Sequence, residues 1–343
     1  MSCSLSRRQN PRQIVLLVVL LASCGAPAGA PPSSAPLTPE SSAPVSPPPA
    51  TTRAARAEIV AREQVGDRQW DLTIASPAVG SDVMVRLLLP SDYQARSARR
   101  WPVLYLLHGC CDDYLSWTRS TDIEQLTTNE GLLVVMPDGG KAGFYSNWRT
   151  GPAWETFHLT ELPGLLAEEY AAGDKAAIGG VSMGGLGALG YAARNPGTFA
   201  AAASFSGIVH TRLSPQVSQD YLGLVQSQGE EPLNLWGDPS KNADVWQRHN
   251  PYDLASRLAG TRVFISCGNG EAGPLDTDGT AADRIETSLE PQNKMFAERL
   301  RSLTPAPTLH LYGRGTHNWV YWEHELHRAW PLITESLGLQ GGR

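Results

Sequence analysis

The spacing of apolar and polar residues along this chain predicts an α/β architecture. Residues 71–74 and 82–89 alternate between apolar and polar side chains, which predicts an opening antiparallel pair of strands. Later apolar runs are short and nearly continuous, as in strands buried on both faces: 103–107, 132–136, 176–178, 200–205, 263–266 and 309–311. Helical spacing marks 154–170, 183–194, 292–303 and 321–337. We therefore expect a mostly parallel central sheet with helices on both faces.

Residues 65–339 have about the length of one large α/β domain and are too few for two domains of typical size. Within them, residues 210–258 are rich in Trp, Asn, Asp and Pro and match neither a strand nor a simple helix. We expect this segment to act as a lid that controls substrate access.

The first residues, 1–23, have the pattern of a lipoprotein signal peptide. Three arginines (Arg7, Arg8 and Arg12) precede an apolar run at 14–21, which is too short to span a bilayer, where a helix needs about 20 residues. Cys24 ends a lipoprotein-type cleavage box and would carry the lipid. The alternative is an ordinary secretory signal cut near residues 28–30. Either way we expect a secreted or cell-envelope protein, anchored to the outer face of the membrane in the first case.

Residues 24–64 are predicted to be a disordered tether, because 25–52 are almost entirely Pro, Ala, Ser and Thr and carry little apolar bulk. Such a segment could hold a catalytic domain away from the envelope, or could have no role. The composition changes again near residue 65, where we place the start of the folded domain.

Charge and cysteine content narrow the function only slightly. Removing the leader takes three arginines from 28 basic residues and none of the 34 acidic ones, so the mature chain has a formal net charge of 25 − 34 = −9. There is no basic stripe of the kind that binds nucleic acid. Of five cysteines, Cys110, Cys111 and Cys267 belong to the domain, and their odd number leaves at least one unpaired. We expect a monomer with no metal or organic cofactor.

The pentapeptide Gly180-Val181-Ser182-Met183-Gly184 lies between a predicted strand and a predicted helix. In that context it resembles the nucleophile elbow of an α/β-hydrolase, with Ser182 as nucleophile. Among 33 glycines such a pentapeptide also arises by chance, so further evidence is needed. A serine requires a general base and an orienting acid, in the chain order Ser, acid, His, and His317 follows at a suitable position. Upstream, His108-Gly109-Cys110 follows a predicted strand, where this fold places half of its oxyanion hole.

Several stretches resemble the antigen 85 mycolyltransferases and their esterase relatives, in family order across about 260 residues. They are Ser76-Pro77-Ala78-Val79-Gly80, Asp112-Asp113-Tyr114 with Trp117, Met136-Pro137-Asp138-Gly139-Gly140, Phe144-Tyr145-Ser146-Asn147-Trp148, Trp154-Glu155-Thr156-Phe157 with Glu161-Leu162-Pro163, Ala177-Ile178-Gly179, Cys267-Gly268-Asn269-Gly270, and Gly315-Thr316-His317-Asn318-Trp319 with Tyr321-Trp322. The aromatic-rich stretches are the most specific.

The resemblance implies roles for single residues. Ser182 matches the nucleophile and His317 the general base. The acid that orients the histidine in the family aligns with Glu286, while Glu290, Asp276 and Asp278 remain alternatives for this role. The fold places one backbone oxyanion donor on Met183 and the family places the other on Cys110, whose alternative role is that of a small buried residue.

The remaining family positions are expected to be mainly structural. Cys267 would pack close to the acid. Most of the tryptophans, and the pair Asp112 and Asp113, would shape the core and a loop, while His108 and Trp319 are candidates for substrate binding.

Two departures concern the substrate. The mycolyltransferases carry an acid where this chain has His108 and an arginine where it has Cys111, and both belong to their sugar site. The acyl-transfer chemistry is therefore expected to carry over, but trehalose as the acceptor is not. We predict a serine carboxylesterase or acyltransferase acting on acyl esters or glycolipids. The alternative is a non-catalytic, adhesin-like envelope protein on the same fold.

Overall fold

The computed structural model describes residues 56–94 and 98–339, which belong to one compact unit. The predicted signal peptide, the predicted lipidation site Cys24 and the predicted tether up to residue 55 lie outside the described residues. Within the described part of the chain, none of the helices has the length and apolar character needed to span a bilayer.

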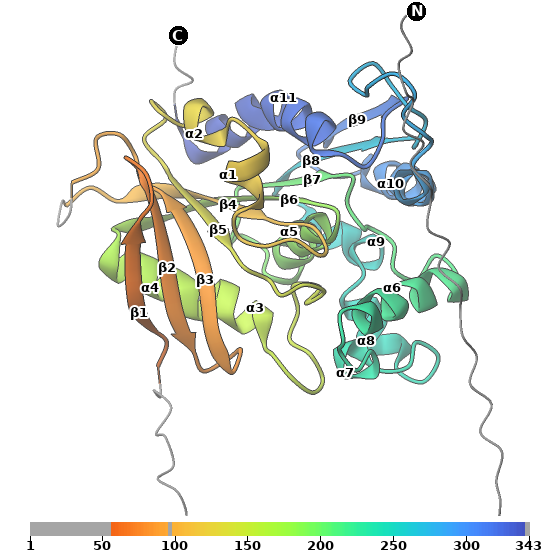
Figure 1. Ribbon diagram of the computed structural model, residues 1–343. Coiled ribbons are helices and arrows are strands. Elements are labelled where there is room, and N and C mark those ends of the chain that lie inside the picture. The colour runs from red at the N-terminus through yellow and green to blue at the C-terminus, as the bar shows by residue number, and fades with distance from the viewer. Residues whose placement is uncertain (1–55, 95–97, 340–343) are drawn as a thin grey trace, which may run out of the picture. The chain divides into compact units, whose positions relative to one another are not determined.

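A nine-stranded sheet forms the centre of this unit, in the order β1-β2-β3-β5-β4-β6-β7-β8-β9 (Figure 1). The strands are β1 Glu58–Gln64, β2 Gln69–Ser76, β3 Ser81–Leu88, β4 Trp101–Leu107, β5 Leu133–Pro137, β6 Ala172–Val181, β7 Ala201–Phe205, β8 Arg262–Gly268 and β9 Thr308–Gly313. Strands β1 to β3 pair antiparallel, β3 joins β5 antiparallel, and the remaining pairs are parallel. The predicted α/β class and mostly parallel sheet are confirmed.

Each central strand contributes to two hydrophobic cores, because successive side chains point to opposite faces. In β4, Val103, Tyr105 and Leu107 belong to one core, and Leu104 and Leu106 to the other. This double burial explains why these strands read as continuous apolar runs in the sequence.

Helices cover both faces of the sheet (Figure 1). On one face lie α4 Leu162–Glu169, α5 Met183–Arg194 and α10 Arg284–Leu300; on the other lie α1 Ser116–Ser120, α2 Ile123–Leu126 and α11 Trp319–Leu337. Before α4, the short α3 Trp154–Thr156 continues into a π-helical turn, Phe157–Glu161. Glu161 accepts hydrogen bonds from Ser76 Oγ (2.5 Å) and the Ala78 N–H (2.9 Å), so it ties the β2–β3 turn to this helical segment.

Two boundaries differ from those expected from the sequence. Residues 58–64 were predicted to belong to the disordered tether but form β1, so the folded domain begins earlier than residue 65. Six of the seven residues of β1 are exposed, and an exposed edge strand shows no apolar alternation. Helix α10 begins at Arg284 rather than at residue 292, with Asp283 as its N-cap and Pro291 in its interior. A proline inside a helix is uncommon, so the first two turns of α10 are hard to predict from the sequence.

The predicted lid segment folds as a series of short helices. They are α6 Pro215–Ser227, α7 Leu233–Trp236, α8 Ala243–Arg248, α9 Pro251–Leu254 and the 3-10 helix Ala255–Leu258. Trp236 donates from Nε1 to Ser146 Oγ (2.9 Å) and packs edge-on against Phe144. The aromatic stretch at 144–148 therefore joins this segment to the rest of the unit. Its role as a lid remains a prediction.

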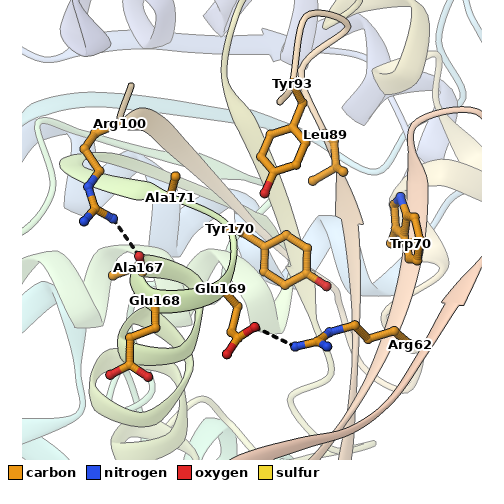
Figure 2. A pocket seen from close by; sticks show the side chains of 10 residues that line it. All are labelled: Arg62, Trp70, Leu89, Tyr93, Arg100, Ala167, Glu168, Glu169, Tyr170 and Ala171. Atoms are coloured by element: carbon orange, nitrogen blue, oxygen red, sulfur yellow. Dashed lines mark hydrogen bonds and ion pairs between the residues drawn. The ribbon is translucent and has the colours of Figure 1, made fainter. Parts of the chain in front are cut away.

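A groove lies at the opposite end of the parallel strands from Ser182, beside the starts of β4 and β6 (Figure 2). Trp70, Tyr93 and Tyr170 line it.

Candidate active site

Ser182 occupies a sharp turn between β6 and α5. Its backbone has φ 54° and ψ −117°, a region that residues other than glycine rarely adopt. The conformation is held by hydrogen bonds on both sides: Ser182 N–H donates to Phe205 O (3.0 Å), and Ser182 O accepts from the N–H groups of Gly185 (3.0 Å) and Ile208 (3.1 Å). The turn thus has the backbone form of a nucleophile elbow.

The glycines around Ser182 are required by close backbone contacts. A Cβ atom at Gly180 would lie 2.2 Å from the carbonyl oxygen of Gly184, and a Cβ at Gly184 would lie 2.3 Å from that of Leu107. A Cβ at Gly109 would lie 3.2 Å from the Cβ of Ser182. The turn after β4 therefore passes directly beside the serine, as the predicted oxyanion hole requires.

His317 and Glu286 are brought together from separate segments. His317 lies in the loop between β9 and α11, and Glu286 in the first turn of α10, and their Nδ1 and Oε2 atoms are 2.7 Å apart. Because an ionised carboxylate only accepts, Nδ1 carries the hydrogen and Nε2 is left as an acceptor. The Glu286 side chain is fully buried and that of His317 is 9% exposed, so this pair is shielded from water.

The carboxylate of Glu286 has three further donors, none predicted from the sequence. Its Oε1 atom accepts from the Gly268 N–H (2.6 Å), from Ser206 Oγ (2.7 Å) and from the thiol of Cys267 (3.3 Å). Burial, followed by the charge of Glu286, raises the pKa of Cys267 well above its usual value, so this thiol stays protonated. The proximity of Cys267 to the acid agrees with its predicted position as a packing residue.

Ser206 connects this carboxylate to the elbow and to α11. It follows Phe205, whose carbonyl receives the Ser182 N–H, and its Oγ accepts from Nε1 of Trp322 (3.1 Å). The ring of Trp322 meets that of His317 edge-on, with centroids 4.8 Å apart. Trp322 thus contacts the imidazole directly and the carboxylate through Ser206. The position of Ser206 at the end of a buried strand was the only feature in the sequence that could have pointed to it.

The alternative acids have other partners. Asp276 accepts from Thr316 Oγ1 (2.6 Å), from the Tyr321 hydroxyl (2.8 Å) and from the Gly273 N–H (2.8 Å). It therefore ties the loop after β8 to the residue next to His317. Glu290 pairs with Lys294 along α10 (2.7 Å), and Asp278 is exposed in the loop. Among the four carboxylates considered, Glu286 is the one hydrogen-bonded to His317.

The predicted oxyanion donors belong to the two segments that meet at Ser182, namely the start of α5 and the turn after β4. Met183 is the first residue of α5, so its N–H has no acceptor within the helix. Cys110 follows Gly109, which contacts Ser182, and a disulfide joins Cys110 to its neighbour Cys111. Cys110 is half-buried, and Cys267 is the free cysteine among the described residues.

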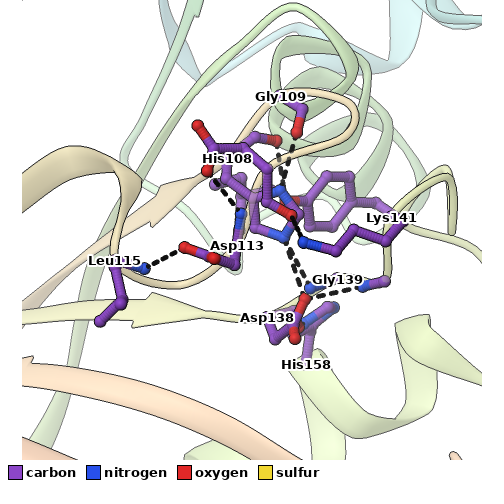
Figure 3. Close-up of polar contacts among 12 residues, drawn as sticks. His108, Gly109, Asp113, Leu115, Asp138, Gly139, Lys141 and His158 are labelled. Atoms are coloured by element: carbon purple, nitrogen blue, oxygen red, sulfur yellow. Dashed lines mark hydrogen bonds and ion pairs between the residues drawn. The ribbon is translucent and has the colours of Figure 1, made fainter. Parts of the chain in front are cut away.

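The predicted role of His108 in binding substrate needs correction, because its side chain is fully buried. Nδ1 lies 2.8 Å from Gly109 O, and Nε2 lies 2.9 Å from Gly139 N and 3.2 Å from Oδ1 of Asp138 (Figure 3). Burial alone would raise the pKa of Asp138, but the neighbouring His108 and the Gly140 N–H, which donates to Oδ1 (3.0 Å), outweigh it and lower that pKa. His108 therefore holds the turn after β4 against the loop after β5.

The other residues of this region are mainly structural. Trp319, the second predicted substrate contact, is half-buried and packs edge-on against Trp117 and Trp322. Asp112 pairs with Arg119 (2.6 Å). Asp113 accepts from the Leu115 N–H (3.0 Å; Figure 3), so both residues shape the loop as expected. Among the described residues, His, Cys, Asp and Glu form no group of three or more that could hold a metal ion.

A sheet of this topology, with a serine on a strained strand-to-helix turn at the carboxyl end of a central strand, is that of an α/β-hydrolase. Two solved structures have a similar fold. MPT51 (FbpC1) of Mycobacterium tuberculosis has a TM-score of 0.64 and 26% identity, and the match covers 76% of this chain and 96% of that chain. The serine hydrolase FphF of Staphylococcus aureus has a TM-score of 0.61 and 22% identity, and the match covers 78% of this chain and 98% of that chain.

The family follows from sequence comparison. Residues 76–333 match the family model described as "Putative esterase", and the chain belongs to that esterase family. It is 31% identical over 284 residues to the diacylglycerol acyltransferase/mycolyltransferase Ag85B of Mycolicibacterium smegmatis, covering 78% of this chain and 85% of that protein. It is 38% identical over 226 residues to an esterase of Mycobacterium tuberculosis, and the match covers 61% of this chain and 48% of that protein. The predicted relationship to the antigen 85 mycolyltransferases and their esterase relatives is confirmed.

Proposed function

We propose that this protein is a serine carboxylesterase or acyltransferase that works through an acyl-Ser182 intermediate. The Ser182 hydroxyl oxygen attacks the ester carbonyl carbon while its proton passes to Nε2 of His317. Collapse of the tetrahedral intermediate breaks the bond to the alcohol oxygen, which takes that proton and leaves. A water or an acceptor alcohol then attacks the acyl-serine, again giving its proton to His317, and Ser182 is restored.

The other residues stabilise charge that develops during these steps. Glu286 orients the imidazole and stabilises its protonated form. The backbone N–H groups of Met183 and Cys110 would donate to the oxyanion. The observation that carries the proposal is the buried 2.7 Å hydrogen bond between Glu286 and His317, because a carboxylate that fixes Nδ1–H leaves Nε2 as a general base.

The decisive test is labelling with a fluorophosphonate probe, which reacts with an activated serine. Wild-type protein should be labelled, and Ser182→Ala should not. Ser227→Ala is the matched control, since Ser227 is exposed on α6, and it should label as the wild type does. Absence of labelling in folded wild-type protein would overturn the proposal and favour the adhesin-like alternative.

A second experiment separates hydrolysis from acyl transfer. Relatives of this chain carry the names esterase and diacylglycerol acyltransferase/mycolyltransferase, so an ester-linked acyl group is the proposed substrate. Purified enzyme would be given a p-nitrophenyl ester, with and without trehalose or diacylglycerol. Free acid as the main product supports an esterase, and an acylated acceptor supports a transferase. We do not expect trehalose to be the acceptor, because His108 and Cys111 replace the acid and the arginine of the sugar site in the mycolyltransferases.

We also propose that the protein is exported and lipid-anchored through Cys24. The support is the Arg-rich, apolar leader that ends in a lipoprotein-type box. Growth of the producing cells with an alkyne-labelled fatty acid should label the wild type but not Cys24→Ser. Labelling that survives in Cys24→Ser would rule out this anchor.

A further inference from the structure

The groove of Figure 2 has a volume of about 650 Å³, within the range of small-molecule sites. Arg100 and Ala171, which line it, directly precede the first residues of β4 and β6. Ser182 follows the last residue of β6, which is 10 residues long. At a rise of about 3.3 Å per residue, the groove lies about 30 Å from the nucleophile, so it cannot be a subsite of the candidate active site.

Aromatic rings supply the apolar part of the groove. Figure 2 shows the ring of Tyr170 below that of Tyr93, with Trp70 to the right of both. Tyr170 is 7% exposed, whereas Trp70 and Tyr93 are half-buried and keep accessible surface. Three aromatic side chains around one hollow offer flat apolar surfaces with polar atoms at their edges.

Charged side chains of both signs supply the polar part. Arg62 pairs with Glu169 (2.9 Å), and Arg100 donates to Ala167 O (2.6 Å). Glu168, also in the wall, pairs with Arg56. The positive charges of two arginines and the negative charges of two glutamates thus cancel in the groove wall. A ligand therefore does not need a net charge to bind there. Each guanidinium group presents two hydrogen-bond donors side by side, and each carboxylate presents two acceptors. Such paired groups can bind two neighbouring hydroxyl groups of a ligand.

The groove also has room for a chain of more than one ring. A second hollow of about 580 Å³ shares Arg62, Glu168 and Glu169 with it and extends past the Arg62–Glu169 pair to Arg56 and Ile59. The two hollows therefore share one charged wall and can be crossed by a linear ligand.

We propose that this aromatic groove binds a neutral oligosaccharide and holds the protein on polysaccharide-bearing material. Sugar rings have apolar C–H faces that stack on aromatic rings, and rows of hydroxyls that bond to paired guanidinium and carboxylate groups. A lipid chain would bury these charged groups without new partners. A proline-rich peptide also fits aromatic grooves, but proline has no N–H to donate to Glu169.

Calorimetric titration of the full chain tests this proposal. The probes are three neutral hexasaccharides (cellohexaose, xylohexaose and maltohexaose), an oligogalacturonate of similar length, and a proline-rich peptide. We expect at least one neutral hexasaccharide to bind with a dissociation constant at or below about 1 mM. Tyr93→Ala and Trp70→Ala should each weaken binding about tenfold or more, because each removes a stacking surface. Tyr93→Phe keeps the ring and should retain most of the affinity.

The controls separate this proposal from that of enzymatic function. Ser182→Ala should bind the oligosaccharide as the wild type does, and Leu233→Ala, an exposed apolar side chain on α7, should have no effect. Tyr93→Ala should keep its activity on a soluble p-nitrophenyl ester, which also shows that the variant folds. The proposal is overturned if no neutral hexasaccharide binds, if the alanine variants bind as tightly as the wild type, or if only the oligogalacturonate or the peptide binds.

Discussion

The carboxylate of Glu286 is held by three donors from two other segments: the Gly268 N–H and the Cys267 thiol at the end of β8, and Ser206 Oγ after β7. With His317 as the fourth partner, the side chain is fully satisfied and cannot rotate without losing several hydrogen bonds. This arrangement sets the tautomer of His317 rather than merely placing a negative charge nearby.

Replacing Glu286 by glutamine should reduce kcat on a p-nitrophenyl ester by about ten-thousandfold, as for other triads whose acid is changed to an amide. The amide would present an N–H where Nδ1 needs an acceptor, which favours the wrong tautomer. Glu290→Gln, one turn along the same helix and paired with Lys294, should retain full activity. A nearly active Glu286→Gln together with an inactive Glu290→Gln would mean that the acid is misassigned.

Asp276 should affect the rate indirectly, by fixing the loop that carries His317. In Asp276→Asn, one of the two oxygens that receive Thr316 and Tyr321 becomes an NH2 group, so one of these bonds is lost. We expect kcat to fall about 10- to 100-fold with KM little changed, since a small displacement of the base is enough to slow proton transfer. A loss as large as that of Glu286→Gln would instead make Asp276 part of the proton-transfer machinery.

At the scale of elements, the turn around Ser182 depends on the close approach of β6, α5 and the segment after β4. Gly180→Ala would place a methyl group 2.2 Å from the carbonyl oxygen of Gly184. We expect it to destabilise the fold by at least about 1–3 kcal/mol, the usual range for overpacking, and to abolish activity. Urea denaturation and the ester assay measure both effects.

Gly164→Ala is the matched control. Gly164 lies inside α4, and no heavy atom lies within 4 Å of a Cβ added there. The change should stabilise the protein by about 0.5–1 kcal/mol, since alanine favours the helix. Equal destabilisation by both variants would show that steric crowding at the elbow is not the cause.

The elements that could be predicted from the sequence are those with two buried faces or a long amphipathic face. Strands β4 and β6 to β8 are apolar on both sides, and α5 and α11 have long repeating patterns. Strand β1 could not be predicted because it is exposed along nearly its whole length. The helices of 210–258 are mostly four to six residues long, so they contain too few turns to show a period.

The site was predictable only in part for a related reason. The elbow and the loop of His317 are local motifs, which a sequence displays directly. The contacts of Glu286 with Ser206, and of Asp276 with Thr316, join residues 80 and 40 positions apart. Such contacts depend on the fold, and the residue types alone do not indicate them.

At the scale of the whole molecule, the buried His158 and the half-buried His249 should make stability depend on pH. Burial lowers the pKa of His158 to about 4 and that of His249 to about 4, from an ordinary value of 6.5. The unfolded chain therefore binds more protons than the folded chain between these values, and the free energy of unfolding falls as pH decreases from 6.5 to 4. The slope should be about 1.4 kcal/mol per pH unit for each histidine.

His158→Gln isolates one of these contributions. His158 contacts Asp138 O from Nε2 (2.8 Å) and the Tyr191 hydroxyl from Nδ1 (2.9 Å), and glutamine can make hydrogen bonds there without titrating. Denaturant unfolding of both proteins from pH 7 to pH 4 should show a shallower decline for the variant. Parallel curves would mean that His158 is not the source of the pH dependence.

The exposed edge strand β1 has a mechanical consequence. Chain tension transmitted from the residues that precede Arg56 enters the sheet at β1, which pairs with β2 alone and buries little surface. Under load its hydrogen bonds to β2 would open one after another, from Glu58 towards Gln64, before β4 and β6 were strained. A pull on this end would thus be absorbed by an edge strand that holds none of the candidate active-site residues, while Ser182, at the far end of the buried strands, kept its geometry.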